Sequence, residues 1–211
     1  IILGAGGHAK VLIDALRLQS VELLGVTDAS IGKKDQLLLD VPVMGGDEEV
    51  MKYPVETIHL VNGVGSVRVN PRRRQLFEHF KSKGYRFASV VHPSAIIATD
   101  VVLSEGAQIM AGAVVQTGCR IGINAVINTG SVVDHDCHIG DHAHISPGAT
   151  LSGGVRVGEN AHVGTGATVI QGIQIGRNSL VAAGAVVIRD VPDGATVAGV
   201  PAKRDVAVRI E

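Results

Sequence analysis

Aromatic residues are scarce in this sequence and unevenly placed. They make up 2% of the 211 residues, tryptophan is absent, and the last aromatic residue is Phe87. The rest of the chain is nevertheless rich in Ile, Val, Leu and Ala. A core filled by aliphatic side chains alone is thin, which disfavours an ordinary β-sandwich or layered α/β domain in this half of the chain.

Other classes of protein are disfavoured by what the composition lacks. Lys and Arg number 19 against 20 Asp and Glu, so there is no excess of positive charge to bind nucleic acid or an anionic membrane. Two cysteines, Cys119 and Cys137, are too few for a disulfide scaffold, and no apolar run is long enough to span a bilayer. The chain starts directly in IILGAGG, without a charged leader. We therefore expect a cytoplasmic protein with reduced thiols, no nucleic-acid partner and no membrane insertion.

A six-residue period runs through the second half of the sequence. When the chain is cut from Val91 onward, all seventeen hexads begin with a branched aliphatic residue, and the fifth position is nearly always small. Glycine often occupies the second or fourth position, where the chain must turn without a Cβ. Neither an α-helix nor a simple strand has this period. The pattern predicts a triangular parallel β-helix in which three hexads form one coil and residues eighteen apart stack.

Residues 1–88 follow a different pattern, in which short apolar strands alternate with helices. Strands are predicted at 1–3, 23–26 and 57–61, and helices at 11–18 and 71–83. This order is typical of a small Rossmann-like α/β domain with a parallel sheet. We expect residues 89–211 to form the second domain, a β-helix with a closing segment at its end.

A glycine-rich turn, GAGGHAK at 4–10, connects the first predicted strand to the first helix. Backbone N–H groups at such a helix N-terminus can approach a phosphate, and Asp28 after the next strand can accept hydrogen bonds from a ribose or sugar. A dinucleotide cofactor is disfavoured, because Ala9 stands where its fingerprint has a third glycine. A tight turn without a ligand is the alternative. The three arginines at 72–74 are interpreted as a solvated helix face, with a phosphate contact as the alternative.

A dense histidine cluster lies in the segment VVDHDCHIGDHAHISPGA. Its members are His135, His138, His142 and His144. Such density suggests a zinc site, but residues three to six apart fall on different turns or sides of a triangular coil, so these side chains do not converge within one chain. We therefore expect no metal.

The phase of the repeat assigns a direction to each of these side chains. His135 and Asp136 fall at a corner turn and point outward, whereas Cys137 faces the core. His144 lies on an outward-facing flat side, and His162, eighteen residues later, is interpreted as a surface residue stacked on it. Since no serine or cysteine stands beside His135, the pattern favours direct general-base catalysis over an acyl-enzyme.

Three segments carry a resemblance to a known family: GAGGHAKV, NTGSVVDHDCHIGDHAHISPGATLSGG and VAGVPAK. With them the chain resembles the nucleotide-sugar N-acetyltransferases of the bacillosamine and perosamine pathways, in a wider family that includes sialic acid O-acetyltransferases. The resemblance spans essentially the whole chain. It implies a left-handed β-helix, acetyl-CoA as co-substrate and a homotrimer. Outward-facing valines on the flat sides agree with side-by-side packing of subunits: Val126, Val132 and Val186.

The resemblance also implies roles for individual residues. His135 takes the proton from the sugar amine, and Asp136 is its acidic neighbour, although the ring could be oriented by Asp136 or by Asp134. The implied acetyl-CoA contacts are His144, which meets the acetyl carbonyl, together with Thr165, Ala183 and Lys203. The implied nucleotide-sugar contacts are Gly6, Gly7, His8, Asp28 and Gly63.

Together these features predict an acetyl-CoA-dependent N-acetyltransferase that acts on the 4-amino group of a nucleotide-linked 4-amino-4,6-dideoxyhexose, carried on UDP or GDP. Only a free amine attacks a thioester, and a histidine with a pKa near neutrality is a suitable base. Three alternatives are an O-acetyltransferase for sialic acid or another sugar, a zinc enzyme of the carbonic-anhydrase kind, and a scaffold that only binds nucleotides.

Overall fold

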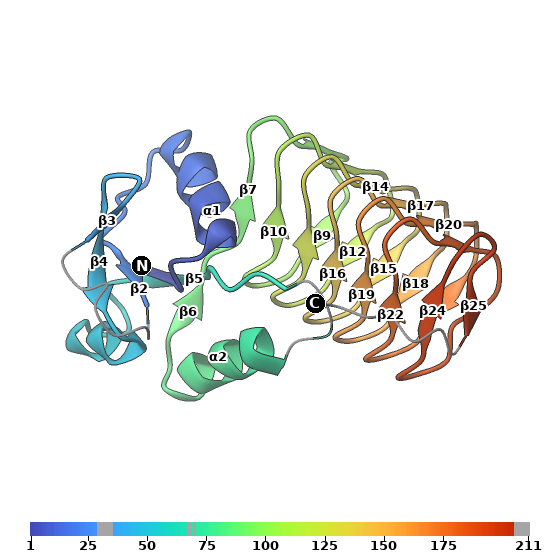
Figure 1. Ribbon diagram of the computed structural model, residues 1–211. Helices are drawn as coiled ribbons and strands as arrows, with labels where there is room; N and C mark the ends of the chain where they lie inside the picture. The colour runs from blue at the N-terminus through green and yellow to red at the C-terminus, as the bar shows by residue number, and fades with distance from the viewer. Residues whose placement is uncertain (29–35, 67–68, 70, 205–211) are drawn as a thin grey trace.

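Two units lie end to end in the computed structural model, which describes residues 1–28, 36–66, 69 and 71–204 (Figure 1). A small α/β unit precedes a long column of stacked coils. Strand β6 ends at Phe87 and the first strand of the column, β7, begins at Val90. We therefore propose the domain boundary between residues 88 and 89.

The N-terminal unit is built on a six-stranded sheet with the order β3-β4-β2-β1-β5-β6. Its pairs are parallel except for β3 with β4, which are antiparallel. The strands are β1 Ile2–Leu3, β2 Val26–Thr27, β3 Leu37–Leu38, β4 Val41–Gly45, β5 His59–Asn62 and β6 Arg86–Phe87. The helices are α1 Gly7–Arg17, α2 Pro71–Ser82 and the 3-10 helix η1 Asp47–Lys52.

The predicted Rossmann-like domain is confirmed, although several of its elements differ from the prediction. Helix α1 begins at Gly7, inside the glycine-rich turn, and not at residue 11, because Ala9 already belongs to the face that it buries on the sheet. The hairpin of β3 and β4 was not predicted. Its turn is made by Leu39 and Asp40 with φ of 50° and 60°, so the glycine or asparagine that signals such a turn is missing.

Seventeen two-residue strands, one every six residues, form the column. They lie in three parallel sheets, which we call the first, second and third sides. The first side contains β7 Val90–Val91, β10 Gln108–Ile109, β13 Val126–Ile127, β16 His144–Ile145, β19 His162–Val163 and β22 Leu180–Val181. The second contains β8 Ile96–Ile97, β11 Val114–Val115, β14 Val132–Val133, β17 Thr150–Leu151, β20 Thr168–Val169 and β23 Val186–Val187. The third contains β9 Val102–Leu103, β12 Arg120–Ile121, β15 His138–Ile139, β18 Arg156–Val157 and β21 Gln174–Ile175.

The predicted triangular β-helix is confirmed, and each hexad lies at the expected position along its coil. Each hexad-initial residue is the second residue of a strand, and residues eighteen apart are paired, as Val115 is with Val133. These aliphatic residues and the small fifth-position residues fill one continuous core. The final coil is shorter, since Leu180 pairs with Thr196, and an antiparallel pair, β24 Thr196–Ala198 with β25 Lys203–Arg204, closes the column.

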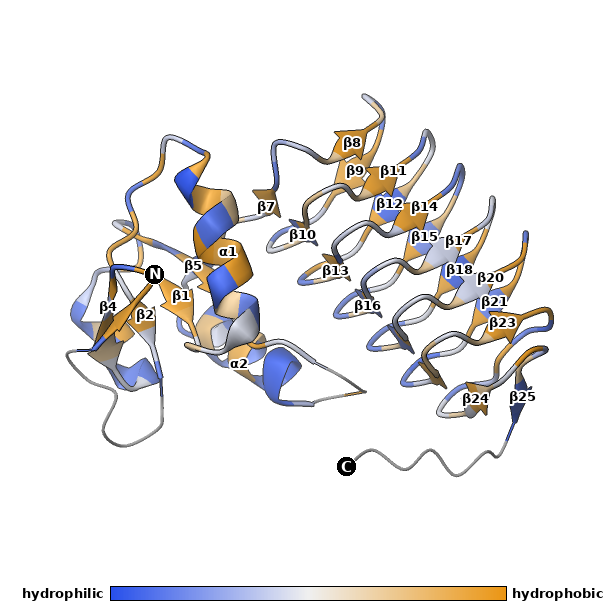
Figure 2. Ribbon diagram, turned by 45° about the horizontal axis from the view of Figure 1, so that its top comes forward, coloured by the Kyte–Doolittle hydropathy of each residue, from blue (hydrophilic) through white to orange (hydrophobic). Residues whose placement is uncertain are grey.

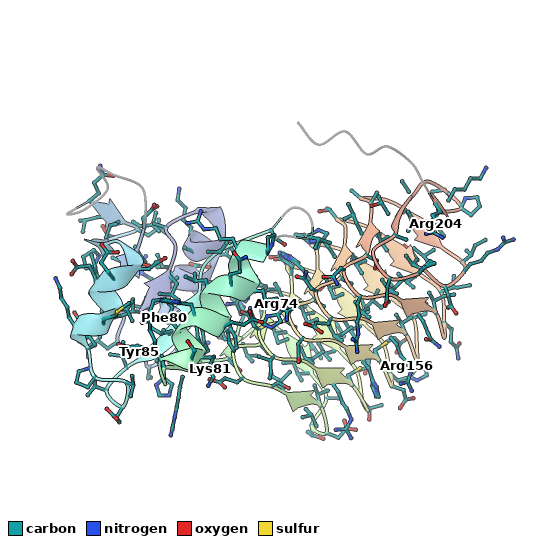
Figure 3. All side chains as sticks on the ribbon, turned by 90° about the horizontal axis from the view of Figure 1, so that it is seen from below. Arg74, Phe80, Lys81, Tyr85, Arg156 and Arg204 are labelled. Carbon is teal, nitrogen blue, oxygen red and sulfur yellow. The ribbon has the colours of Figure 1, made fainter. Side chains whose placement is uncertain are left out.

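The N-terminal unit docks on the first side of the column. His8 Nε2 lies 2.7 Å from Gln108 Oε1. From helix α2, Lys81 Nζ reaches Glu105 at 2.9 Å and Arg74 reaches Glu159 at 2.5 Å, on the face that Figure 3 shows from below. This docking buries the outer residues of the first side, which are Gln108, Val126, His144 and His162.

Docking corrects two sequence interpretations. Val126, expected on an outer packing surface, is 1% exposed because the N-terminal unit covers it. Arg73, expected on a solvated helix face, is 4% exposed and donates to the carbonyl oxygens of Asn62 and Val64 at 2.9 Å and of Asn124 at 3.3 Å. Burial lowers the pKa of Arg73 to about 9, so the guanidinium remains charged near neutral pH.

Across the part of the chain that the structure describes, no helix combines the length and the apolar character needed to cross a membrane.

Replacing Arg73 by Ala should lower the free energy of unfolding by about 2 to 4 kcal/mol, because buried carbonyl groups at the junction of the two units lose their donors. Chemical denaturation followed by far-UV circular dichroism measures the change. Gln75→Ala, at an exposed position of the same helix, is the matched control and should leave stability unchanged. Equal stability of the two variants would contradict this role of Arg73.

Candidate active site

His135 and Asp136 form a hydrogen-bonded pair at the corner between the second and third sides, in the turn between β14 and β15. Asp136 Oδ2 lies 2.8 Å from His135 Nδ1. The side chain of His135 is 49% exposed, so the ring is open to a substrate. Asp136 has a φ of 59°, a left-handed conformation that aspartate adopts more readily than most residues.

Of the two carboxylates beside His135, Asp136 contacts the ring, whereas Asp134 Oδ1 accepts the backbone N–H of His135 at 2.7 Å. A carboxylate can only accept, so Nδ1 carries the proton and Nε2 of the neutral ring is an acceptor. The hydrogen bond to Asp136 is the main reason that the pKa of His135 lies above its ordinary value. The corner thus holds a base whose accepting nitrogen faces away from its partner.

A cavity of about 290 Å³ lies over the glycine-rich turn. Helix α1 begins there; its N-cap, Gly6, has an extended backbone with no side-chain cap, and no residue of the first turn is acidic. Its N–H groups therefore remain able to bind an anion. All five residues expected to contact the nucleotide sugar line this cavity: Gly6, Gly7, His8, Asp28 and Gly63.

Arg72 also lines the cavity, and it is the only Lys or Arg among the described residues that do so. Sequence interpretation placed it on a solvated face, although a phosphate contact was the alternative. The signal was available in the run of three arginines, but only the fold separates the buried Arg73 from Arg72 at the cavity.

A second cavity, of about 770 Å³, lies along the first side and begins at α1. Three of the four expected acetyl-CoA contacts line it, namely His144, Thr165 and Ala183, whereas Lys203 lies exposed on β25 and does not. Three residues line both cavities: Gly7, His8 and Gly65. The expected nucleotide-sugar and acetyl-CoA contacts therefore meet where α1 begins.

A chain of hydrogen bonds connects two buried histidines in this second cavity. Asn128 Nδ2 lies 3.1 Å from His144 Nε2, and His144 Nδ1 lies 3.0 Å from Ser66 Oγ. Ser66 Oγ is 3.4 Å from His162 Nδ1, and His162 Nε2 is 3.0 Å from Ser146 Oγ. Because the amide nitrogen can only donate, the neutral His144 carries its proton on Nδ1 and donates it to Ser66.

The interpretation of His162 as a surface residue was wrong. It is 4% exposed, and its ring centroid lies 4.9 Å from that of His144. The eighteen-residue spacing indicated the stacking, but the covering residue, Ser66, comes from the distant N-terminal unit. Burial lowers the pKa of His162 to about 4. Burial also holds the pKa of His144 well below its ordinary value, and the charge of the neighbouring His162 adds to this effect. Both rings are neutral near pH 7.

The corner pair is separated from both cavities within one chain. The larger cavity lies along the first side and the smaller one is lined by the N-terminal unit alone, whereas His135 and Asp136 occupy the corner between the other two sides and line neither cavity. The four clustered histidines are likewise separated: His135 at this corner, His138 on the third side, His142 at the next corner and His144 on the first side. Among residues 1–28, 36–66, 69 and 71–204, no group of three or more His, Cys, Asp or Glu is placed to hold a metal ion.

Comparison with family models matches residues 1–80 to the PglD N-terminal domain, residues 118–153 to the bacterial transferase hexapeptide (six repeats) and residues 154–189 to the hexapeptide repeat of succinyl-transferase. No curated protein sequence matches significantly.

Three solved structures are similar over nearly the whole chain. A variant of perosamine N-acetyltransferase from Caulobacter crescentus, in complex with CoA and GDP-perosamine, is 39% identical, with a TM-score of 0.90 over 97% of this chain and 95% of that chain. The acetyltransferase domain of PglB from Neisseria gonorrhoeae, in complex with acetyl coenzyme A, is 35% identical, with a TM-score of 0.85 over 96% and 97% of the two chains. WeeI from Acinetobacter baumannii is 26% identical, with a TM-score of 0.86 over 96% and 97%.

The column and the site together define an acyltransferase of the hexapeptide-repeat class, with a left-handed β-helix. The chain belongs to the family of nucleotide-sugar N-acetyltransferases that includes perosamine N-acetyltransferase. The resemblance seen in the sequence is thereby confirmed.

Acid should destabilise this protein through its buried histidines. Burial, with a smaller contribution from Arg73, lowers the pKa of His8 to about 4, as burial does for His162. Between pH 6.5 and about 4 these histidines are protonated in the unfolded chain but remain neutral in the folded chain. The free energy of unfolding should therefore fall as the pH drops through this interval, by about 2 to 3 kcal/mol for each histidine. Denaturation midpoints between pH 7 and 4.5 measure the fall. His162→Gln should make the fall shallower, whereas His59→Gln at an exposed position should not; identical pH dependence in both would refute the assignment.

Proposed function

We propose that the protein transfers the acetyl group of acetyl-CoA to the 4-amino group of a nucleotide-linked 4-amino-4,6-dideoxyhexose. The observation that carries this proposal is the His135–Asp136 pair, in which the 2.8 Å hydrogen bond leaves Nε2 free to accept a proton. The similarity to a perosamine N-acetyltransferase in complex with CoA and GDP-perosamine supports the substrate class. The cavity at the glycine-rich turn is suited to the nucleotide diphosphate, with Arg72 and the start of α1 offering positive charge and N–H groups.

The proposed reaction is a direct transfer. The free amine of the sugar attacks the thioester carbonyl carbon, and His135 Nε2 takes the proton that the nitrogen releases. The tetrahedral intermediate then expels the CoA thiolate, which takes up that proton from the imidazolium. Asp136 stabilises the imidazolium while it is charged, because its carboxylate faces Nδ1.

His144 is proposed to contact the acetyl carbonyl. As a neutral ring it has a single N–H, and this N–H is directed at Ser66 in the present structure. A contact with the carbonyl oxygen therefore requires the proton of His144 to be redirected when acetyl-CoA binds. The present hydrogen bonds of the His144 ring to Ser66 and Asn128 must then break.

We propose that the site is completed between subunits of a homotrimer. The second side bears outward apolar residues, among them Ile96, which is 66% exposed, and Figure 2 shows its strands β8, β11, β14 and β23 as hydrophobic. Packing the second side of one subunit against the first side of the next, around a threefold axis, brings the corner of His135 to the cavities of the neighbour. This arrangement explains why the base and the cavities are separated within one chain.

We also propose a cytoplasmic location. The balanced charge and the two free cysteines, Cys119 and Cys137, support it, because thiols stay reduced in that compartment.

Replacing His135 by Ala should lower kcat by about 100- to 10,000-fold while the protein remains folded, because the amine loses its base. CoA release from acetyl-CoA, with UDP- and GDP-linked 4-amino sugars and a sialic acid offered in parallel, measures the turnover and the acceptor. His138→Ala, three residues further on and outside the pair, is the matched control and should retain activity. Near-normal kcat in His135→Ala would overturn the proposal, and turnover with the sialic acid alone would favour the O-acetyltransferase.

Mixed trimers test whether two chains share one site. Gly6→Val fills the space beside the glycine-rich turn, where a Cβ meets no atom within 4 Å, so the fold should tolerate it while phosphate binding is blocked. His135→Ala and Gly6→Val chains should each be inactive alone, yet about one quarter of normal activity should return after mixing in equal amounts, since one site in four combines two intact halves. No recovery after verified subunit exchange would place the whole site within one chain.

A further inference from the structure

The ring of His135 lies directly against Gly153 on the next coil. A Cβ built at residue 153 would stand 2.4 Å from His135 Nε2, 2.5 Å from Cε1 and 3.1 Å from Cδ2, and these are its three nearest atoms. Real Cβ atoms essentially never approach that closely, so the ring occupies the space that a side chain at 153 would need. Gly153 is buried beneath it.

The fold itself does not call for glycine at this position. Gly153 is absent from the residues with positive φ, unlike Gly118 and Gly154 at neighbouring corner positions. The position stacked on it eighteen residues earlier is His135 itself. Two other coils place larger residues at the equivalent position, Thr117 thirty-six residues before and Gln171 eighteen residues after, and both are exposed. The glycine at 153 is therefore explained by the His135 ring on the preceding coil and not by the backbone.

We propose that Gly153 is a positioning residue for the transfer reaction: the absence of its Cβ leaves a notch in which the ring of His135 rests with Nδ1 on Asp136. Three contacts then define the base. Asp134 holds its backbone N–H at 2.7 Å, Asp136 holds Nδ1 at 2.8 Å, and Gly153 leaves room for the edge that carries Nε2. The proposal rests on the function proposed above for His135.

A methyl group at residue 153 would rotate the ring out of the notch and away from Asp136. The accepting nitrogen would then no longer be held in one direction, and the ring would lose the hydrogen bond that raises its pKa. The exposed corner has space for the displaced ring, so the column can remain folded.

Gly153→Ala should lower kcat by about 10- to 100-fold, the range expected when a catalytic group is misplaced by about 1 Å. The KM values for both substrates should change little, because residue 153 lines neither cavity. The acid limb of the pH–rate profile should move to lower pH. Gln171→Ala, at the stacked position of the next coil, is the matched control and should behave as wild type. A wild-type kcat and pH profile in Gly153→Ala would overturn the proposal.

Two measurements test whether the His135 ring occupies the notch, and neither depends on catalytic turnover. In NMR titrations, the His135 ring should carry its proton on Nδ1 in the wild-type protein, and Gly153→Ala should mix the tautomers and lower the pKa of the ring. In a thermal double-mutant cycle, Gly153→Ala should lower Tm in the wild-type background and not in the His135→Ala background, because the obstructing ring is then absent. An equal loss of Tm in both backgrounds would show that the backbone conformation requires glycine at 153, whatever the position of the His135 ring.

These measurements also separate the two proposals. If His135→Ala retains activity, the proposed function fails, yet the Tm cycle still reports whether the ring occupies the notch. If the cycle shows no coupling while His135→Ala is inactive, the positioning role fails and the proposed function stands.

Discussion

The hydrogen-bonded register between successive coils is the constraint on which the rest of the structure depends. Each strand of the column pairs with the strand eighteen residues away, so the position of a residue within its hexad decides whether its side chain points into the core, onto a flat side or out of a corner. The core accepts one branched aliphatic and one small residue per hexad for the same reason. His135 and Asp136 are outward and adjacent because the register places them at a corner, and Gly153 lies beneath them because one further coil brings it there.

Whether the N-terminal unit covers a side of the column decides the direction in which the pKa of a histidine there is shifted. His135, at an exposed corner beside Asp136, has a raised pKa, whereas His144 and His162, on the side covered by the N-terminal unit, have lowered pKa values. Desolvation penalises the charged ring in the second case, and a carboxylate stabilises it in the first. One column therefore carries a base that can be protonated and two rings that donate or accept hydrogen bonds without charge.

Periodic features were predictable from the sequence, and features that depend on distant contacts were not. The hexads predicted every strand of the column from β7 to β23, since local backbone geometry decides them. The cavity at the glycine-rich turn gathers all its expected residues because the turn follows β1, while Asp28 and Gly63 follow β2 and β5, the two strands that pair in parallel with β1. The burial of Val126, Arg73 and His162 depends on docking between units far apart in sequence, and no local pattern announces it. Lys203, carried over by resemblance alone, lies on β25 away from the cavities.

The absence of rings from the column has a spectroscopic consequence. Both tyrosines, Tyr53 and Tyr85, belong to the N-terminal unit, where Tyr85 Oη donates to the carbonyl oxygens of Val50 at 3.0 Å and Tyr53 at 2.9 Å. With no tryptophan in the chain, intrinsic fluorescence and near-ultraviolet signals arise from this unit alone. Melting of the coils gives no signal at those wavelengths, so loss of the tyrosine signal reports the unfolding of the N-terminal unit alone. Unfolding of the column has to be followed by methods that detect the backbone.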